Sequence, residues 1–407
     1  MLPSPVRLVL VLCLGLAGCG GGSTPPPWRA DGIGGDFYGG PDGESGQEVR
    51  VGLLLPLSGD QRPVGEDALR AAEMAIFDRG DNDVVLLPRD SGASSSRAAE
   101  AARSLVADGA QLLIGPLYSE GVSAVADQRG TAPVLAFSNN ASVARPGVWL
   151  LGFRPEEQVT RVVEYARSQG LSTFSGYGPG DAFGSLTLAS LRASVARAGG
   201  RLQAIETYQA GSQPSASLVR PLTQPGRPDA VFIADGGVQA RALAATVAYA
   251  GAEDEAPEAN PPAEPGTSRF LGTQRWLADP ELGSEPGLTG SWLAAPSPEA
   301  LDAFVQRFED AFGTRPADPI IASLAYDAAA MAAELSLSDQ GYNDAALTDP
   351  LGFYGASGVF RLRPDGLTDH GLAVLEVTPS GPVQIEDAPS SLPVPEEAGL
   401  GALLPTQ

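Results

Sequence analysis

Hydroxyl and amide side chains gather in two short segments that each follow a predicted strand. Ser119 comes after an apolar strand over 111–115 and begins a predicted helix over 119–128. The next strand, over 133–137, is followed by Ser138, Asn139, Asn140 and Ser142. Parallel sheets bind ligands at the carboxyl ends of their strands, where free N–H groups at helix starts suit a carboxylate. We therefore expect these residues to bind a carboxylate, with the alternative that Ser119 caps its helix and Ser142 caps a turn.

The composition excludes most catalytic chemistry. The 407-residue chain has a net charge of −23, and all 26 of its basic residues are arginines. This excludes Schiff-base chemistry and a lysine-based phosphate loop. His370 is the one histidine, which leaves no histidine triad or multi-histidine metal site, and we expect it in a surface turn. The acidic chain also has no basic stripe for nucleic acid. We therefore expect a protein that is not an enzyme and has no metal or cofactor.

The first residues predict an exported, lipid-anchored protein. Residues 1–18 combine Arg7, a short apolar run and small residues, which is typical of a signal peptide. Cys19 follows Leu-Ala-Gly and resembles the lipobox of bacterial lipoproteins, which implies cleavage before Cys19 and its acylation. The alternative is an ordinary cleaved signal with an incidental cysteine. Cys13 leaves with the signal, so the mature chain has no internal disulfide.

Three other segments have compositions that do not build a core. Residues 19–47 are rich in glycine and proline, and we expect a flexible tether there. An acidic, proline-rich insert over 253–265 is expected to be a disordered surface loop, and residues 387–407 a disordered tail.

Apolar strands and amphipathic helices alternate in two series between the tether and the tail. The predicted strands of the first series are 49–56, 83–87, 111–115 and 133–137. The second series starts with a helix over 156–168, and its first strands are 171–177, 202–208 and 229–234. This alternation predicts parallel sheets covered by helices, hence an α/β protein with two lobes. Two later apolar runs, 359–362 and 372–377, predict a β-hairpin.

Several segments resemble the type I periplasmic binding proteins of the leucine/isoleucine/valine-binding family. These segments are 51–59, 113–119, 133–138, 181–184, 228–232 and 324–328. The resemblance covers about 49–378 and implies two Rossmann-like lobes, the Venus flytrap arrangement, joined by three crossovers with the ligand in the cleft. It places the first lobe at 48–153 and 296–345, and the second lobe at 154–295 and 346–386.

The resemblance also implies a set of ligand-binding residues. In amino-acid-binding members the loops matching Ser119 and Ser138 hold the α-carboxylate. The acidic residue that usually meets the ammonium aligns with Gln239, and nearby Asp235 either substitutes for it or caps the following helix. A common aromatic hydroxyl aligns with Phe183, which has none. The implied residues are Ser58, Tyr118, Ser119, Ser138, Asn139, Asn140, Ser142, Phe183, Asp235 and Gln239.

Two functions follow as expectations. The first is binding of a small amino-acid-like ligand in the periplasm for an ABC permease. The second is suggested by leucine-binding-type lipoproteins known as penicillin-binding protein activators, which this chain resembles at 52–59, 89–92, 114–117 and 151–158. That resemblance implies a peptidoglycan synthase as the partner and a degenerate or sensory cleft. The best-known activators carry an additional N-terminal helical-repeat domain, where this chain has a short linker. Gly20 in place of Asp after Cys19 favours the outer membrane of a Gram-negative cell.

Overall fold

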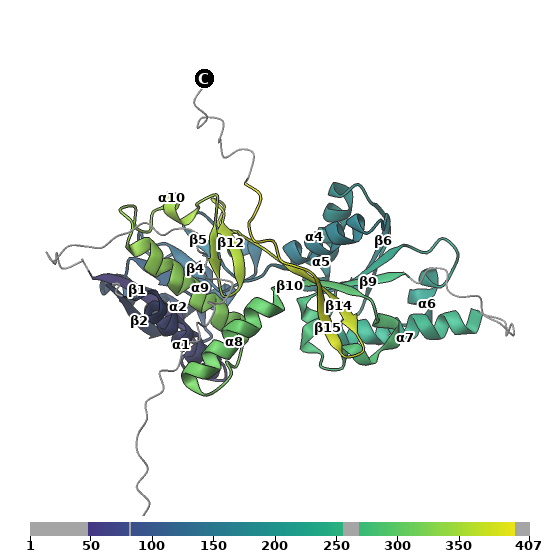
Figure 1. Ribbon diagram of the computed structural model, residues 1–407, viewed down its shortest axis with the longest axis horizontal. Helices are drawn as coiled ribbons and strands as arrows, with labels where there is room; N and C mark the ends of the chain where they lie inside the picture. The colour runs from purple at the N-terminus through teal and green to yellow at the C-terminus, as the bar shows by residue number, and fades with distance from the viewer. Residues whose placement is uncertain (1–47, 81–82, 255–267, 395–407) are drawn as a thin grey trace, which may run out of the picture. The chain divides into compact units, whose positions relative to one another are not determined.

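The computed structural model describes residues 48–80, 83–254 and 268–394 (Figure 1). The expected signal peptide, Cys19, the tether and most of the acidic insert lie outside the described residues. The predicted strands and helices of both series are present, with ends that move by a few residues.

The first lobe is built on a five-stranded parallel sheet with the order β2-β1-β3-β4-β5. Strand β1, which lies between β2 and β3, carries the sequence VRVGLLL, and the last five of these residues are buried because helices cover both faces of the sheet. The strands are β1 Val49–Leu55, β2 Val84–Asp90, β3 Leu112–Ile114, β4 Val134–Ala136 and β5 Val148–Leu150. The helices that follow the first three are α1 Arg62–Arg79, α2 Ser95–Ala107 and α3 Ser119–Ala126.

The second lobe is built on a seven-stranded sheet with the order β15-β14-β10-β9-β8-β6-β7. The five strands from β10 to β7 are parallel, and β14 and β15 extend the sheet as antiparallel strands. The strands are β6 Thr173–Pro179, β7 Arg201–Tyr208, β8 Ala230–Ile233, β9 Arg269–Thr273, β10 Trp292–Ala295, β14 Ala373–Thr378 and β15 Gly381–Glu386. The helices are α4 Pro155–Ser168, α5 Ala182–Arg197, α6 Ala216–Val219 and α7 Gly237–Asp254.

In both lobes a glycine near the start of a helix allows that helix to pack against the end of the first strand. A Cβ atom on Gly65 of α1 would collide with the carbonyl of Pro56, directly after β1. A Cβ atom on Gly184 of α5 would likewise collide with the carbonyl of Pro179, at the end of β6. Glycine at these two positions allows the start of each helix to lie against the carboxyl end of its strand.

Three crossovers join the lobes. The chain passes from β5 into α4, from β10 into α8 (Pro298–Phe312), and from β13 (Thr368–His370) into β14. Helix α9 (Pro319–Ser336) follows α8 and packs against α1 in the first lobe. The expected two-lobed α/β fold with three crossovers is therefore confirmed.

The predicted β-hairpin near the carboxyl end is wrong. Strand β12 (Gly358–Leu362) pairs with β11 (Phe353–Gly355) and β13 in a small antiparallel sheet, whereas β14 pairs with β10 and β15. Trp149 of β5 donates its indole N–H to the Arg363 carbonyl, so this small sheet is attached to the first lobe. The structure thus differs from the expected boundary: of 346–386, the part over 353–370 lies with the first lobe.

The beginning of the expected disordered tail is packed in the structure. After β15 the chain runs back toward β12 (Figure 1), where the Pro393 carbonyl accepts a 2.8 Å hydrogen bond from Arg361. The Asp387 carbonyl also lies 3.5 Å from an Arg161 nitrogen. Residues 387–394 therefore contact both lobes, and the tail beyond them lies outside the described residues.

Candidate functional site

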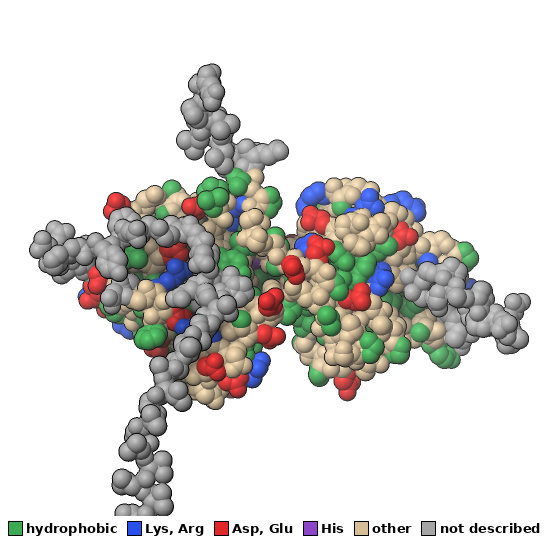
Figure 2. All heavy atoms as spheres, in the orientation of Figure 1, with side chains coloured by type: hydrophobic (Ala, Val, Ile, Leu, Met, Phe, Trp, Pro, Cys, Tyr) green, Lys and Arg blue, Asp and Glu red, His purple; other side chains and the backbone are tan. Residues whose placement is uncertain are grey.

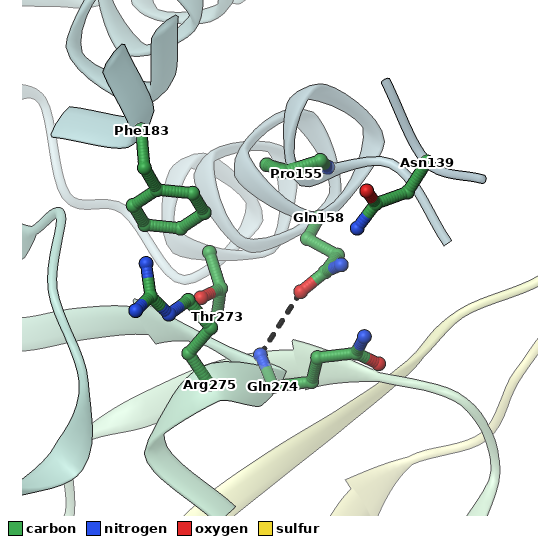
Figure 3. Close-up of a pocket in the computed structure, with 7 residues that line it drawn as sticks. All are labelled: Asn139, Pro155, Gln158, Phe183, Thr273, Gln274 and Arg275. Atoms are coloured by element: carbon green, nitrogen blue, oxygen red, sulfur yellow. Dashed lines mark hydrogen bonds between the residues drawn. The ribbon is translucent and has the colours of Figure 1, made fainter. Parts of the chain in front are cut away.

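A cavity of about 320 Å³ lies at the carboxyl ends of strands from both lobes. Its walls come from the loop after β4, the start of α5 after β6, the end of β9 and the start of the crossover helix α4 (Figure 3). The lining residues are Asn139, Pro155, Gln158, Phe183, Thr273, Gln274 and Arg275. Its position agrees with the general placement of ligand sites in parallel sheets.

Gln158 holds the wall of this cavity in place. Its side chain is buried, its Oε1 accepts a 2.9 Å hydrogen bond from the Gln274 N–H, and its Nε2 lies 3.4 Å from the Phe153 carbonyl. Figure 3 shows the first of these bonds as a dashed line. Because both ends of the amide bind backbone, Gln158 fixes the end of β9 to the first crossover.

The turn that carries Gln274 and Arg275 is held in place by contacts outside the cavity. Trp276 is fully buried, and its ring occupies the space beside Gly272 where a side chain would be. The Arg241 guanidinium then binds the Asp279 carboxylate at 2.7 Å just after the turn. These contacts hold the backbone, while the side chains of Gln274 and Arg275 extend to the cavity (Figure 3).

The charged group of the cavity is the Arg275 guanidinium. Its central carbon lies 4.1 Å from the centroid of the Phe183 ring, which is cation–π geometry. Phe183 is held at the start of α5 because the Asp181 carboxylate caps that helix by accepting the Gly184 N–H at 2.8 Å. No lining residue is acidic, and Arg275 forms no ion pair within the part of the chain that the structure describes.

Two buried polar atoms at the cavity lack a hydrogen-bond partner among the described residues. They are the hydroxyl Oγ1 of Thr273 and the side-chain Oε1 of Gln274. Thr273 is 2 % exposed. Because buried polar atoms in proteins are normally paired, these two are suited to bind water or a ligand.

The segment after β4 brings one of its predicted residues to the cavity. Asn139 lines it, and its side-chain amide points toward it (Figure 3). The other three bind one another instead: the Ser138 hydroxyl accepts the Asn140 N–H at 3.2 Å, and Asn140 Oδ1 accepts the Ser142 hydroxyl at 2.8 Å. They shape the turn that presents Asn139.

The predicted residues after β1 and β3 are not among the residues that line the cavity. Tyr118 precedes α3, and the Ser119 hydroxyl lies 3.4 Å from Glu120 within that helix. The Ser58 hydroxyl accepts a 2.8 Å hydrogen bond from Arg97, which also pairs with Asp90. Burial alone would raise the pKa of Asp90, but its hydrogen bonds from Ser58 and from backbone N–H groups, with the Arg97 charge, lower it.

In the second lobe, Phe183 lines the cavity and the two residues after β8 do not. The Asp235 carboxylate accepts the Tyr208 hydroxyl at 3.0 Å and the Gly236 N–H at 2.7 Å. Burial and the nearby Asp235 charge raise the pKa of Tyr208 above its ordinary range. Gln239 has a buried Oε1 without a hydrogen-bond partner among the described residues, but it lies outside the cavity lining.

Sequence reasoning missed five lining residues. Residues 270–272 have the pattern of a strand in the sequence, and Thr273, Gln274 and Arg275 come directly after them, so the argument from strand ends used for Ser119 would have found these three residues. Pro155 and Gln158 carried no such signal because they lie in the first turns of a helix whose inward face is marked by apolar residues.

The expectation that His370 occupies a surface turn is wrong. Its side chain is 2 % exposed, and its Nδ1 lies 3.0 Å from Glu157 Oε1. Its ring contacts the Phe153 ring, with centroids 4.4 Å apart. His370 is buried because β13 is the last strand before the third crossover and packs against the first crossover there.

Other classes of site find little support in the described residues. No group of three or more His, Cys, Asp or Glu side chains is placed there to hold a metal ion. No helix in the same ranges is long and apolar enough to cross a membrane. On the face drawn in Figure 2, arginines are interspersed with acidic side chains rather than gathered in a basic stripe.

Comparison with known proteins identifies the family. A family model described as periplasmic binding protein matches residues 48–382. The chain belongs to the periplasmic binding protein family. The match includes both lobes and all three crossovers, so the type I binding-protein fold applies to almost the whole described chain.

Solved structures of other binding proteins share this fold. A putative branched-chain amino acid ABC transporter protein from Rhodospirillum rubrum is 19 % identical, with 83 % of this chain and 100 % of that one covered and a TM-score of 0.69. A branched-chain amino acid ABC transporter periplasmic ligand-binding protein from Burkholderia xenovorans is 18 % identical, with 83 % and 94 % covered and a TM-score of 0.64. A solute-binding protein from R. palustris, solved with benzoate, is 19 % identical, with 85 % and 98 % covered and a TM-score of 0.54.

A curated relative gives little information about the function of this binding protein. The uncharacterized protein RP748 of Rickettsia prowazekii is 23 % identical over 121 residues. The match spans 29 % of this chain and about a third, 32 %, of that relative.

Proposed function

We propose that this periplasmic binding protein captures a small carboxylate-bearing solute, amino-acid-like in size, and delivers it to an ABC permease. The observation that carries the proposal is the cavity at the strand ends, with its Arg275 guanidinium and two buried polar atoms that lack hydrogen-bond partners among the described residues. A cavity of about 320 Å³ falls at the lower end of the range of about 300–1,000 Å³ that small-molecule pockets occupy. Relatives of this fold include a branched-chain amino acid transport protein and a benzoate complex, which supports a solute of this size.

The proposal is tested by thermal unfolding of the full chain, purified in detergent, against a panel of L-amino acids and small organic acids. A ligand at about 100 times its Kd stabilises the folded state by about 2.7 kcal/mol, which raises the midpoint of a chain of this size by several degrees. A panel of neutral sugars and polyols serves as the control. If no amino acid or organic acid at millimolar concentration shifts the midpoint, the proposal is wrong.

Cys19 is proposed to carry the lipid anchor, with the outer membrane favoured in a Gram-negative cell. Several acyl chains hold a protein on a bilayer because each buried CH₂ contributes about 0.8 kcal/mol. We expect Cys19→Ala to move the protein from the membrane fraction to the soluble periplasmic fraction or to leave an uncleaved precursor, whereas Cys13→Ala leaves it on the membrane. Membrane retention of the Cys19→Ala variant in processed form would contradict the anchor.

The alternative function is activation of a peptidoglycan synthase. The resemblance at 89–92 and 151–158 supports it. In the structure Asp90 of the first segment accepts the N–H groups of Leu57 and Gly92, and the second segment forms the first crossover and the start of α4. The residues of both segments are buried or half-buried. The test is glycan polymerisation by a purified bifunctional synthase with and without the full chain. Stimulation without any solute ligand would favour this function over the receptor.

A further inference from the structure

We propose that the cavity selects carboxylates that lack an α-ammonium group, with Arg275 as the group that binds the carboxylate. This inference rests on the proposed function, and it narrows the class of solute from amino-acid-like molecules to simple organic acids. The inference is supported by the charge, the hydrogen-bonding groups and the geometry of the residues that line the cavity.

The cavity lining offers no negative charge to an ammonium group. None of its lining residues is acidic. The carboxylates of the adjoining second-lobe turns are already bound: Asp181 caps α5, Asp235 accepts from Tyr208 and Gly236, and Asp279 pairs with Arg241. A ligand ammonium placed beside Arg275 would be desolvated without a counter-charge and would meet a like charge, and both effects oppose binding.

Arg275 is well placed to bind an anion. Its guanidinium carbon lies over the Phe183 ring, 4.1 Å from the centroid, so one face is covered and the N–H edges remain available. A guanidinium binds a carboxylate through two parallel N–H···O bonds. No carboxylate of the described residues competes for it.

The remaining walls suit an uncharged body. Pro155 and the Phe183 ring provide apolar surface, and in Figure 3 they lie on the same side of the cavity, facing Thr273 and Gln274. The Thr273 hydroxyl and the Gln274 Oε1, both without partners among the described residues, supply neutral hydrogen bonds. The Asn139 amide approaches from the first lobe. This combination fits a small aliphatic or aromatic acid, with or without a hydroxyl substituent.

The experiment compares three matched compounds in an aliphatic and an aromatic series, titrated calorimetrically into the full chain. The aliphatic series is 4-methylpentanoate, 4-methylpentanamide and L-leucine, and the aromatic series is 3-phenylpropanoate, 3-phenylpropanamide and L-phenylalanine. In at least one series the acid is expected to bind about tenfold or more tightly than both the amide and the amino acid.

Arg275→Gln tests the residue itself. Arg275 is exposed and supports no backbone, so the variant is expected to keep its unfolding temperature while the acid loses about tenfold or more in affinity and the preference over the amide disappears. Arg275→Lys keeps the charge without the planar fork and is expected to retain part of the affinity. Arg192→Gln is the matched control, because Arg192 is exposed on α5 and does not line the cavity.

The outcomes separate this inference from the proposed function. Equal or tighter binding of the amino acids would overturn the inference and leave the receptor standing. A preference for acids over amides that persists unchanged in the Arg275→Gln variant would do the same. Failure of all six compounds and of the wider panel to bind would remove the receptor function as well.

Discussion

Replacement of Asp327 by alanine is expected to lower the free energy of unfolding by about 4 kcal/mol, because it leaves several buried donors unpaired. Asp327 lies on α9 and is 2 % exposed. Its carboxylate accepts the backbone N–H groups of Ala356 and Ser357 and the Ser357 hydroxyl. These bonds attach the turn between β11 and β12 to the first lobe, so we expect the small antiparallel sheet to loosen first.

Urea unfolding measures the change, with Asp327→Asn as the control. The asparagine keeps one oxygen acceptor in nearly the same volume, so its loss of stability should be smaller, about half that of the alanine variant. A loss of less than about 1 kcal/mol for Asp327→Ala, within the range of ordinary surface substitutions, would show that this attachment is not needed.

The pH dependence of stability gives a second measurement on the same residue. Burial raises the pKa of Asp327 from 3.8 to about 6, although hydrogen bonds from Ser357 and Ala356 and the nearby His370 oppose the shift. A folded-state pKa above the unfolded value means that the protonated carboxyl stabilises the fold below about pH 4, and that this contribution is lost as the pH rises through about 6. The stability difference between the wild type and Asp327→Asn is therefore expected to change across about pH 4–6, measured from urea midpoints. A constant difference would show that the carboxyl is not perturbed.

The sequence was sufficient to predict the alternating strands and helices, because each of these elements is determined by a short stretch of neighbouring residues. The strands of the parallel sheets are apolar runs, and several of the helices that follow them start at a capping residue, such as Ser94 before α2 and Asp181 before α5. Strands β12 and β14 are also apolar runs, and nothing in their own residues distinguishes a hairpin from two separate sheets. The strands with which β12 and β14 pair are determined by the crossover between β13 and β14, where Gly371 packs against Val359 and Pro389.

In the candidate site too, the residues that local sequence patterns mark were predicted, and those that depend on the folded turn were not. The argument from strand ends reached Asn139 directly, and the family resemblance reached Phe183, because each lies just after a strand that the sequence shows. Whether a given loop residue faces the cavity depends on the turn it adopts: Ser138, Asn140 and Ser142 have the right chemistry but bind one another. His370 is the clearest case of a residue that the sequence could not place. It is buried by a segment far away in the chain, and the residues next to it in the sequence do not indicate this burial.

The second large effect is expected at Glu157, whose carboxylate connects two crossovers. It accepts the Arg154 N–H at 2.7 Å and lies 3.0 Å from His370 Nδ1, and Arg154 in turn donates to the Thr368 carbonyl at 3.0 Å. Arg154 and His370 are both buried. The Arg154 guanidinium lies 3.6 Å from Glu157 Oε2. Glu157→Ala would leave this buried guanidinium without its counter-charge, so we expect a loss of about 3 kcal/mol in the free energy of unfolding.

The matched control for this variant is Glu164→Ala, an exposed glutamate on the same helix α4, for which we expect a change within about 0.5 kcal/mol. Native-state hydrogen exchange locates the effect: protection should fall in β13 and at the start of α4, the two segments that Glu157 joins, and remain unchanged in β6 and β7. Because these segments lead from one lobe to the other, the variant should also change the ligand affinity of the receptor even though Glu157 does not line the cavity. Equal stability of the two variants would mean that Arg154 and His370 find other partners, and the crossovers would then be held by their apolar contacts, such as that between Phe153 and the imidazole ring.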